Sequence, residues 1–478
     1  MGEHKSAWQM VRAELSLLVA GVVALFTGWL TWITGGTGAM LLLIPGIVGS
    51  VLFAVHRRKK KDPNGEWSEP KVRRHEIWAV AKGIVLVCVV WNGVSFVKYV
   101  AHDNGDTLSQ RAATWARNHG MNGTIDYLEA KVYSTPPSKD PAKGLAVVEG
   151  GTSVPDASPG TTTPGGSTPA SNPNGGATTS TAPTTTEKVA GPAPAAPTDL
   201  TPVFSPPLAG EGKFSVLAKA GGQPAMWLTG IRPLQSAGGV VGTVVVIDQT
   251  YLRSGLFNGS EEPGGTWQRG NKVPNELQPA LVAAMNGGFR LQHIKGGYVT
   301  EGRVVKPLKV GDATMAVSKD GKLVIGALGR EIKDDGSWLS LRQNLMLIVD
   351  GGQSQVQRGI QLGVWWGADF GNKVYVNRSG ICQLKDGRLA YALIGKVDAE
   401  QFAQSLINIG CVKAMQLDIN GTWPNFDTYT HNADGSLTPH LVDDRMGTNL
   451  RRYLKGSSKE FIAFFNAEQV PAKSVLDV

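Results

Sequence analysis

The chain has 478 residues, which is more than one compact domain usually holds, so we expect at least two regions. Its net charge is +8, but residues 1–100 carry twelve Lys and Arg against six Asp and Glu, and the remaining 378 residues are nearly neutral. A nucleic-acid surface needs its basic residues on the folded domain. The distribution of charge therefore argues against a nucleic-acid partner.

Three apolar runs stand in the first 100 residues. Leu15–Thr34 has 20 residues without a charge, Ala39–Val55 has 17, and Ile77–Val97 is interrupted only by Lys82. Each run is long enough to cross a hydrocarbon core of roughly 30 Å. The sequence predicts that residues 1–100 are a membrane anchor of three transmembrane α-helices, the alternative being a re-entrant or tightly packed hairpin over residues 15–55.

The orientation of this anchor follows from the basic segment Arg57–His75, RRKKKDPNGEWSEPKVRRH, because basic loops stay on the cytoplasmic side. With that loop inside, three spans place the N-terminus in the cytoplasm and everything after Val100 outside. We therefore expect a multi-pass protein of the cell membrane with an extracytoplasmic C-terminal domain.

Three regions follow the anchor. Residues 101–133 carry apolar side chains at helical spacing and predict a juxtamembrane helical element. Residues 134–207 consist almost entirely of Pro, Thr, Ser, Gly and Ala, which cannot bury a core, so we expect a disordered linker. Residues 211–478 show short apolar runs between glycine turns and predict a folded domain.

The sequence of this domain predicts an α+β fold with a mixed β-sheet, β-hairpins and few helices. Residues 240–247 predict a strand, and Asp-Gly turns inside 316–326 and 376–395 predict two hairpins. One helix is expected between Asp398 as its N-cap and Gly410 as its end. We expect this helix to join neighbouring parallel strands, residues 388–394 and 413–419, with the second as an inner strand that delivers Asp418 to its C-terminal edge.

The cysteines leave one question open. Cys382 and Cys411 flank the predicted helix and could form a disulfide outside the membrane, or could be free buried thiols. The chain has no CxxC pair and no His cluster with metal-ligand spacing, which argues against zinc. We expect no organic cofactor and leave a divalent metal open, with no ligand set predicted.

Glycine-linked polar residues stand at four strand ends of the domain, at 286–290, 296–301, 350–352 and 418–421. Paired glycines let a backbone approach a ligand and let amide N–H groups converge on an anion. The alternative for each cluster is a plain tight turn, in which Asn and Asp are favoured for local hydrogen bonding. Four clusters in one domain, together with Arg290 and Arg378, favour a binding site.

The domain resembles the catalytic domain of the phosphodiester glycosidases, the family of the enzyme that removes N-acetylglucosamine from a phosphodiester on lysosomal glycans. AAMNGGFR (283–290), RSGICQLKDGRLAYALIG (378–395) and AEQFAQSLINIGCVKAMQLDING (399–421) carry the resemblance, in order and spacing. It covers about 200 residues of the domain and none of the membrane part.

The resemblance implies that Asn286 and the glycines after it line a pocket, that Arg378 contacts the substrate phosphate, and that Asp418 occupies the acidic position. The family commonly has Asp-Gly-Gly-Gly-Ser where this chain has Asp-Ile-Asn-Gly-Thr at 418–422, and residues 350–354 are a nearer copy of that pattern. The predicted catalytic residues are Asp418, Glu301 and Asp350, and the predicted substrate-binding residues are Asn286, Gly287, Gly288, Arg290, Arg378 and Asn420.

Two further groups leave alternatives open. The aromatic residues Trp365, Trp366, Trp423, Phe426 and Tyr429 suit either a wall that stacks on a sugar or a buried core. The basic residues Arg445, Arg451 and Arg452 could contact phosphate, but we expect a solvated surface.

The function predicted from the sequence is a membrane-anchored extracytoplasmic hydrolase. Its expected partners are the membrane and a phosphodiester-linked glycan or cell-wall polymer of the cell envelope, and protein partners are left open. A carboxylate would assist the cleavage of a sugar–phosphate bond, and Arg and amide groups would neutralise the phosphate charge. The alternative is a catalytically inactive glycan-binding or scaffold module of the same fold.

Overall fold

The structure of the chain, a computed structural model, describes residues 74–102, 108–121, 124–125, 135–147, 192–367, 374–419, 423–447 and 449–478. By its internal contacts the chain divides into two units, residues 1–95 and residues 96–478. The described part of the first unit lies in helix α3 (Arg74–Ala101), which continues to residue 101. All other described elements belong to the second unit.

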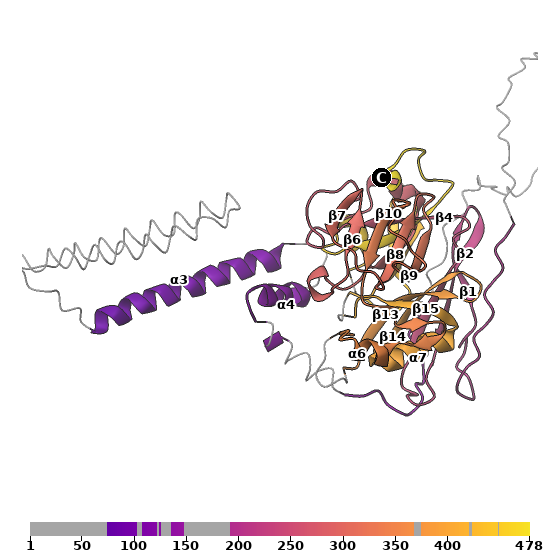
Figure 1. Cartoon of the computed structure of the whole chain (residues 1–478), viewed down its shortest axis with the longest axis horizontal. Coiled ribbons are helices and arrows are strands. Elements are labelled where there is room, and N and C mark those ends of the chain that lie inside the picture. Colours follow the sequence, from indigo (N-terminus) through magenta and orange to yellow (C-terminus); the bar gives the residue numbers. More distant parts are fainter. Residues whose placement is uncertain are drawn as a thin grey trace, which may run out of the picture. The chain divides into compact units, whose positions relative to one another are not determined.

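The largest sheet has eight strands in the order β1-β2-β3-β14-β13-β15-β11-β12 (Figure 1). In chain order their bounds are β1 (Ser215–Ala220), β2 (Gln223–Ile231), β3 (Gly242–Ile247), β11 (Val349–Asp350), β12 (Gln353–Ser354), β13 (Val376–Leu384), β14 (Leu389–Val397) and β15 (Cys411–Gln416). The inner strand β15 is buried along its second half and ends two residues before Asp418.

Two smaller sheets have five strands each, in the orders β7-β6-β10-β8-β9 and β17-β16-β5-β18-β4. The first holds β6 (Tyr298–Thr300), β7 (Arg303–Lys306), β8 (Ala313–Ser318), β9 (Leu323–Ala327) and β10 (Trp338–Gln343). The second holds β4 (Leu252–Phe257), β5 (Leu281–Asn286), β16 (Phe426–His431), β17 (Leu437–Leu441) and β18 (Phe461–Asn466). In the described part of the chain, every pairing between these strands is antiparallel.

Helices are few and short in the second unit. The α-helices are α4 (Leu108–Asn118), α6 (Val356–Gln361), α7 (Ala399–Ile409) and α8 (Arg452–Lys455), and the 3-10 helices are η2 (Asn275–Ala280), η3 (Leu291–His293) and η4 (Val475–Asp477). Helix α4 lies inside the range expected for a juxtamembrane helical element. The predicted domain rich in β-strands with few helices is confirmed.

Local sequence signals account for several of these elements. The Asp-Gly turns close the hairpins β8–β9 and β13–β14, as predicted. Helix α7 begins at Asp398, whose carboxylate accepts the N–H of Gln401 at 2.8 Å, and ends at Gly410 with φ 99°. Only glycine adopts that left-handed conformation without strain, so it stops the helix there.

The strand order corrects the expected crossover. Strands β14 and β15, which α7 joins, run in the same direction but are not neighbours, because β13 lies between them and pairs antiparallel with both. The short Asp-Gly hairpin places β13 beside β14 first, so the returning chain adds β15 on the other side of β13. The sheet is thus antiparallel, and α7 crosses one strand.

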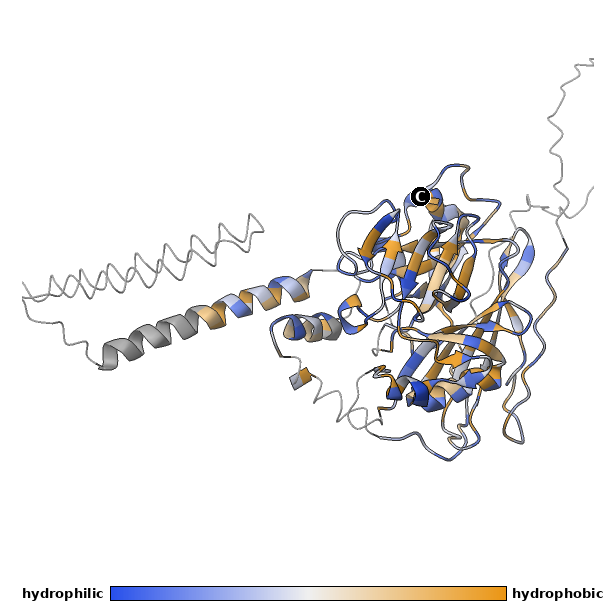
Figure 2. Ribbon diagram, in the orientation of Figure 1, coloured by the Kyte–Doolittle hydropathy of each residue, from blue (hydrophilic) through white to orange (hydrophobic). Residues whose placement is uncertain are grey.

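The main core lies among the three sheets. It combines apolar side chains of β3 and β14 from the large sheet, β8 and β9 from the second sheet, and β5 and β18 from the third. A second cluster fills the space between the large sheet and α7, and a third covers the other face of β5 and β18. Apolar residues accordingly concentrate on the strands in Figure 2.

The disulfide question is answered by a bond between Cys382 on β13 and Cys411 on β15, whose Cα atoms are 5.6 Å apart. It links neighbouring strands at the end of β15 that is remote from Asp418.

Residues at both ends of the predicted linker form backbone hydrogen bonds with the folded domain. Ala142 donates its N–H to Gly238 at 2.9 Å, Gly239 donates to Ser138 at 2.9 Å, and Leu200 donates to Gly212 at 2.8 Å. A Cβ atom on Gly238 would come within 2.6 Å of the Lys139 carbonyl, so the missing side chain makes room for this segment. Residues 135–147 and 192–207 therefore pack on the domain, and residues 148–191 lie outside the described residues.

Of the three expected membrane spans, the first two fall outside the described residues and the third falls within α3. Among the residues that the structure describes, no helix has both the length and the apolar character needed to cross a membrane.

Candidate active site

Three strand ends from distant parts of the chain meet at one place. Strand β5 ends at Asn286, which pairs with Phe461 at the start of β18, so that Glu460 lies beside Gly287. The residue two positions beyond β15, Asp418, donates its N–H to the carbonyl of Gly287 at 3.2 Å. Gly287 therefore contacts both carboxyl-bearing residues.

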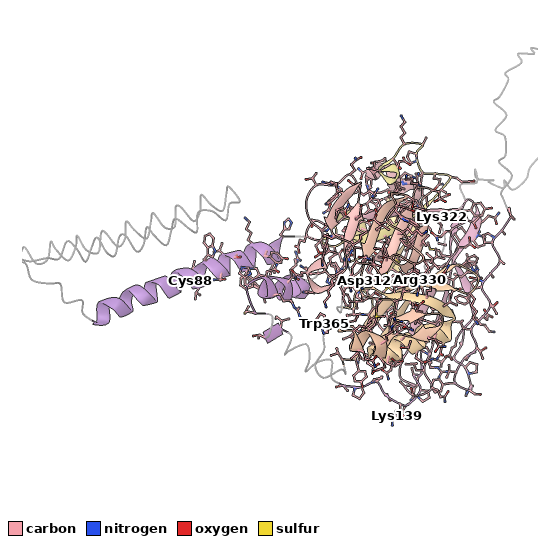
Figure 3. All side chains as sticks on the ribbon, viewed as in Figure 1. Cys88, Lys139, Asp312, Lys322, Arg330 and Trp365 are labelled. Carbon is pink, nitrogen blue, oxygen red and sulfur yellow. A yellow bond between two sulfur atoms is a disulfide. The ribbon has the colours of Figure 1, made fainter. Side chains whose placement is uncertain are left out.

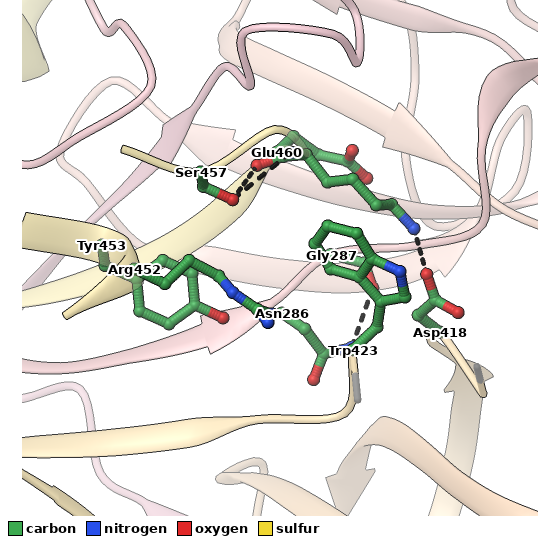
Figure 4. A pocket seen from close by; sticks show the side chains of 9 residues that line it. Asn286, Gly287, Asp418, Trp423, Arg452, Tyr453, Ser457 and Glu460 are labelled. Atoms are coloured by element: carbon green, nitrogen blue, oxygen red, sulfur yellow. Dashed lines mark hydrogen bonds and ion pairs between the residues drawn. The ribbon is translucent and has the colours of Figure 1, made fainter. Parts of the chain in front are cut away.

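A small cavity lies at this meeting point, with about 10 Å³ of space for the centre of a water molecule (Figure 4). Three of its lining residues belong to the predicted site, namely Asn286, Gly287 and Asp418. The others are Trp423, Arg452, Tyr453, Ser457, Lys459 and Glu460. A space of this size holds about one water molecule.

Asp418 takes part in a buried ion pair. Its carboxylate accepts a hydrogen bond from the ammonium group of Lys459, and the two side chains are 7% and 4% exposed. Lys459 also donates to the carbonyl of Gly288 at 3.0 Å, and its Nζ lies 4.9 Å from the centre of the Trp423 ring. The cation is thus fixed between the carboxylate, a backbone carbonyl and an aromatic face, which offsets the cost of burying the charge.

Glu460 is the second carboxyl group of the cavity. Its Oε1 accepts the N–H of Gly288 at 2.9 Å and lies 2.8 Å from the guanidinium of Arg342. Its Oε2 is buried and has no hydrogen-bond partner among the described residues. Burial raises the pKa of the Glu460 carboxyl, and the positive charges of Arg342 and Lys459 oppose this shift.

Asn286 connects the strand ends and uses its whole amide in doing so. Its Nδ2 donates to the carbonyl of Gly287 at 3.0 Å and to Ser379 Oγ at 3.1 Å. Its Oδ1 accepts from the Tyr391 hydroxyl and from the N–H of Asn425, both at 3.0 Å. Ser379 in turn donates to the carbonyl of Asp418 at 2.7 Å. In this state Asn286 orients Gly287 and Asp418.

Arg452 corrects a prediction, because its side chain is 1% exposed instead of solvated. Its guanidinium lies 4.6 Å from the centre of the Trp423 ring, which is itself buried. The short helix α8 begins at Arg452 and packs Tyr453 against Phe461 of β18, with ring centres 4.5 Å apart. This packing brings a second cation to the cavity wall.

Residues 280–418 match the model of the family described as phosphodiester glycosidase. This segment of the chain is therefore similar to the phosphodiester glycosidases. The resemblance drawn from the sequence is thereby confirmed, and the matching segment begins just before β5 and ends at Asp418. No protein of curated function matches the chain.

Among solved structures, the catalytic domain of zebrafish N-acetylglucosamine-1-phosphodiester alpha-N-acetylglucosaminidase, auto-inhibited by its pro-peptide, is 17% identical. The alignment covers 52% of this chain and 87% of that one, with a TM-score of 0.36. A hypothetical protein from Synechocystis is 11% identical, with coverages of 51% and 63% and a TM-score of 0.34. A putative exported protein from Burkholderia pseudomallei is 11% identical, with coverages of 49% and 75% and a TM-score of 0.24. These structural likenesses are weak.

Arg378 of the phosphodiester glycosidase segment lies outside the cavity lining. Its guanidinium donates to the carbonyls of Val397, Trp366 and Val374 at 3.0, 2.7 and 3.3 Å, and to Gln416 Oε1 at 3.2 Å. Burial lowers its pKa to about 10. The structure therefore uses Arg378 to join strands and loops behind β15, whereas the sequence predicts a phosphate contact.

Two of the three predicted catalytic residues are not brought to the cavity. Glu301, with φ 49°, accepts the N–H groups of Gln268 and Arg269 at 3.0 and 2.8 Å. Asp350 accepts two hydrogen bonds, of 2.7 and 2.8 Å, from Arg330, which is labelled in Figure 3. Both carboxylates are engaged in local structure.

The remaining predicted substrate-binding residues differ in their position relative to the cavity. Gly288 touches both Glu460 and Lys459 through its backbone. Arg290 lies 3.5 Å from Glu261 and does not line the cavity. Asn420 lies outside the described residues.

Most of the predicted aromatic residues are buried, and the described residues include no group of metal ligands. Phe426 and Tyr429 belong to the core, Trp366 is buried, and Trp365 is 44% exposed. In the part of the chain that the structure describes, no three His, Cys, Asp or Glu side chains form a group that could hold a metal ion.

Four cavity residues that the sequence patterns did not single out, Tyr453, Ser457, Lys459 and Glu460, lie in one stretch, RRYLKGSSKE (451–460). It places cations and a glutamate directly before β18, which is buried throughout. A mostly polar run directly before a buried and mostly apolar strand resembles the four polar clusters at strand ends noted above, although it contains a single glycine. That contrast is the signal that could have drawn attention to it.

Proposed function

We propose that the chain hydrolyses phosphodiester-linked sugars and that the cavity at Asp418 is its active site. The observation that carries the proposal is that the matching family segment ends at Asp418, where this carboxylate lines a cavity together with Lys459 and Arg452. Cations beside a buried carboxylate suit a substrate that is both a sugar and a phosphate.

The reaction requires little from an acid because a phosphodiester group leaves readily as a phosphomonoester. It requires positive charge near the leaving oxygen and a carboxylate near the sugar carbon, where positive charge develops. Lys459 and Arg452 would supply the first, and Asp418 the second. Asn286 and Gly287 would keep Asp418 in place through the hydrogen bonds described above.

We infer that the substrate lies in the cell envelope and that residues 1–100 anchor the enzyme in the membrane. The three apolar runs and the basic segment between them support this placement. The disulfide between Cys382 and Cys411 also supports an extracytoplasmic domain, because disulfides persist in oxidising compartments.

A catalytically inactive glycan-binding module of the same fold is the second candidate. The observation that favours it is Ile419, which stands where the family commonly has glycine. Ile419 packs in the apolar cluster beside α7, and a Cβ atom on Gly367 would come within 2.2 Å of it. A bulky side chain thus fills space next to Asp418.

The test uses the full chain in detergent and a methyl phosphodiester of N-acetylglucosamine 1-phosphate, with other sugars in parallel. We expect release of free sugar and methyl phosphate. Asp418→Asn should lower kcat/KM about 10³-fold, in the range seen when a key charged group is removed from an active site. Asp350→Asn, the matched control at the other Asp-Gly strand end, should stay within about twofold.

Two other outcomes would contradict this proposal. Turnover that survives Asp418→Asn would remove the cavity from consideration as the active site. Saturable binding of the phosphodiester without turnover would favour the glycan-binding module.

The membrane placement has its own test. Protease added to intact cells should degrade residues 192–478, whereas a tag at the N-terminus should be reached only after the cells are opened. Protection of the domain in intact cells would contradict the extracytoplasmic placement.

A further inference from the structure

We propose that Glu460 is the general base that activates the hydrolytic water. This inference rests on the proposed function and assigns a second carboxylate to it. In the step, the water oxygen bonds to the anomeric carbon and one water proton passes to Glu460 Oε2. The bond from that carbon to the phosphate oxygen breaks, and its electron pair leaves with the phosphomonoester.

The first reason is the hydrogen bonding of the carboxyl group. The Oε2 atom of Glu460 is buried and has no partner among the described residues, although the residue lines the cavity. An unpaired carboxylate oxygen in the interior costs free energy unless a ligand or water occupies the space beside it. A water molecule in the cavity would satisfy this oxygen and would be held where a base can take its proton.

The second reason is that the other half of the carboxyl group is fixed. Oε1 is held by the N–H of Gly288 and by Arg342, and both members of the ion pair have fully buried side chains. Arg342 is anchored in turn by the carbonyl of Phe289. Because Oε1 is committed, Oε2 is the atom that remains for chemistry.

The third reason is a division of roles between the two carboxylates. Lys459 pairs with one carboxylate oxygen of Asp418. This ion pair keeps Asp418 negatively charged close to the sugar carbon, but it occupies that oxygen. Glu460 has its cation on Oε1 only. Burial raises the pKa of Glu460, which moves it towards the range in which a general base works best at neutral pH.

Gly287 supports the same assignment. A Cβ atom at this position would come 2.5 Å from Glu460 Oε1 and 2.8 Å from its backbone carbonyl. Any side chain would push the carboxyl group away, so glycine permits the close approach of β5 and β18 at this point.

The experiment compares Glu460→Ala and Glu460→Gln with wild type in hydrolysis of the same methyl phosphodiester, with and without azide. We expect each variant to lose about 10²–10⁴-fold in kcat, the usual contribution of a general base. Azide needs no deprotonation, so it should restore turnover in Glu460→Ala and yield a glycosyl azide. Wild type should form the free sugar as its main product.

Glu211→Gln is the matched control. Glu211 forms an equally buried pair with Arg232, with side chains 0% and 4% exposed, but lies outside the cavity. It should lose stability in thermal melting as Glu460→Gln does, while keeping the wild-type kcat. This comparison separates a catalytic role of Glu460 from a merely structural one.

The outcomes that overturn the inference are distinct from those that overturn the proposed function. If wild type turns over and Glu460→Gln retains its kcat, or if azide restores nothing in Glu460→Ala, Glu460 is not the base. If wild type itself shows no turnover, the proposed function fails and this inference fails with it.

Discussion

Two aspartates end neighbouring strands of the same sheet, and only one of them reaches the cavity. Asp350 closes β11 and is followed by two glycines, whereas Asp418 follows β15 and is followed by Ile419. The sequence around Asp350 is the nearer copy of the family pattern. Yet Asp350 pairs with the half-exposed Arg330, while Asp418 is 5% exposed and pairs with the buried Lys459.

The direction of the strands explains the difference. Strand β11 runs antiparallel to β15, with Asp350 opposite Lys413 near the start of β15. Asp418 lies beyond the other end of β15. The two aspartates therefore stand at opposite edges of the sheet, and the cavity lies at the edge that meets β5 and β18.

The largest expected effect concerns the ion pair at Asp418. Lys459→Met removes the cation from a buried pair and should lower the free energy of unfolding by about 3–5 kcal/mol. The double variant Lys459→Met/Asp418→Asn should recover part of this loss because it also removes the buried negative charge. Urea unfolding of the three proteins measures the effect, and equal stability of the single and double variants would contradict it.

The disulfide tests whether the two ends of β15 are independent. Cys411 lies at the start of β15, near Asp350 and away from Asp418. The double variant Cys382→Ala/Cys411→Ala opens a loop of 29 residues in sequence separation. It should cost about 3–4 kcal/mol by loop entropy. Thermal melting should show this loss, whereas kcat/KM at low temperature should stay within about twofold of wild type. A large fall in kcat/KM would mean that the two sheet edges are mechanically coupled.

Local signals in the sequence predict much of this fold, and the reasons are visible at particular residues. The two Asp-Gly hairpins and helix α7 between Asp398 and Gly410 depend on residues close together in the chain. The position of β13 between β14 and β15 depends on which strands pair, and local sequence does not encode that choice. The predicted neighbouring parallel strands were wrong for this reason.

The proposed site likewise combines residues that local sequence singles out with residues that only the fold brings together. Asn286, Gly287 and Asp418 end strands in a recognisable way, and the structure brings them together. Glu460 reaches them only because β18 pairs with β5 across more than 170 residues. Arg378 carries a charge that suggests a ligand, but its buried position makes it a donor to backbone carbonyls. Burial and pairing, which are properties of the fold, decide both cases.

Two glycines, one at each sheet edge, sharpen the comparison. Gly287→Ala would force a Cβ atom against Glu460 and should cost about 1–3 kcal/mol through overpacking. Gly351→Ala meets nothing within 4 Å, but φ is 59°, so it should cost about 1 kcal/mol through backbone conformation alone. The stabilities are therefore similar, and activity separates them. Gly287→Ala should lower kcat/KM more than tenfold, whereas Gly351→Ala should leave kcat/KM unchanged.

The smallest expected effect lies at Asp350. Its partner Arg330 has a side chain 51% exposed, so Arg330→Met should lower the free energy of unfolding by only about 0.2–1 kcal/mol. Because solvent ions screen exposed charges, the difference from wild type should shrink when the salt concentration rises from 0.05 M to about 1 M. The corresponding difference for Lys459→Met should persist in high salt, because that pair is buried. If both differences respond alike to salt, the two aspartates do not differ in burial, and the contrast between the two edges of the sheet would have to be abandoned.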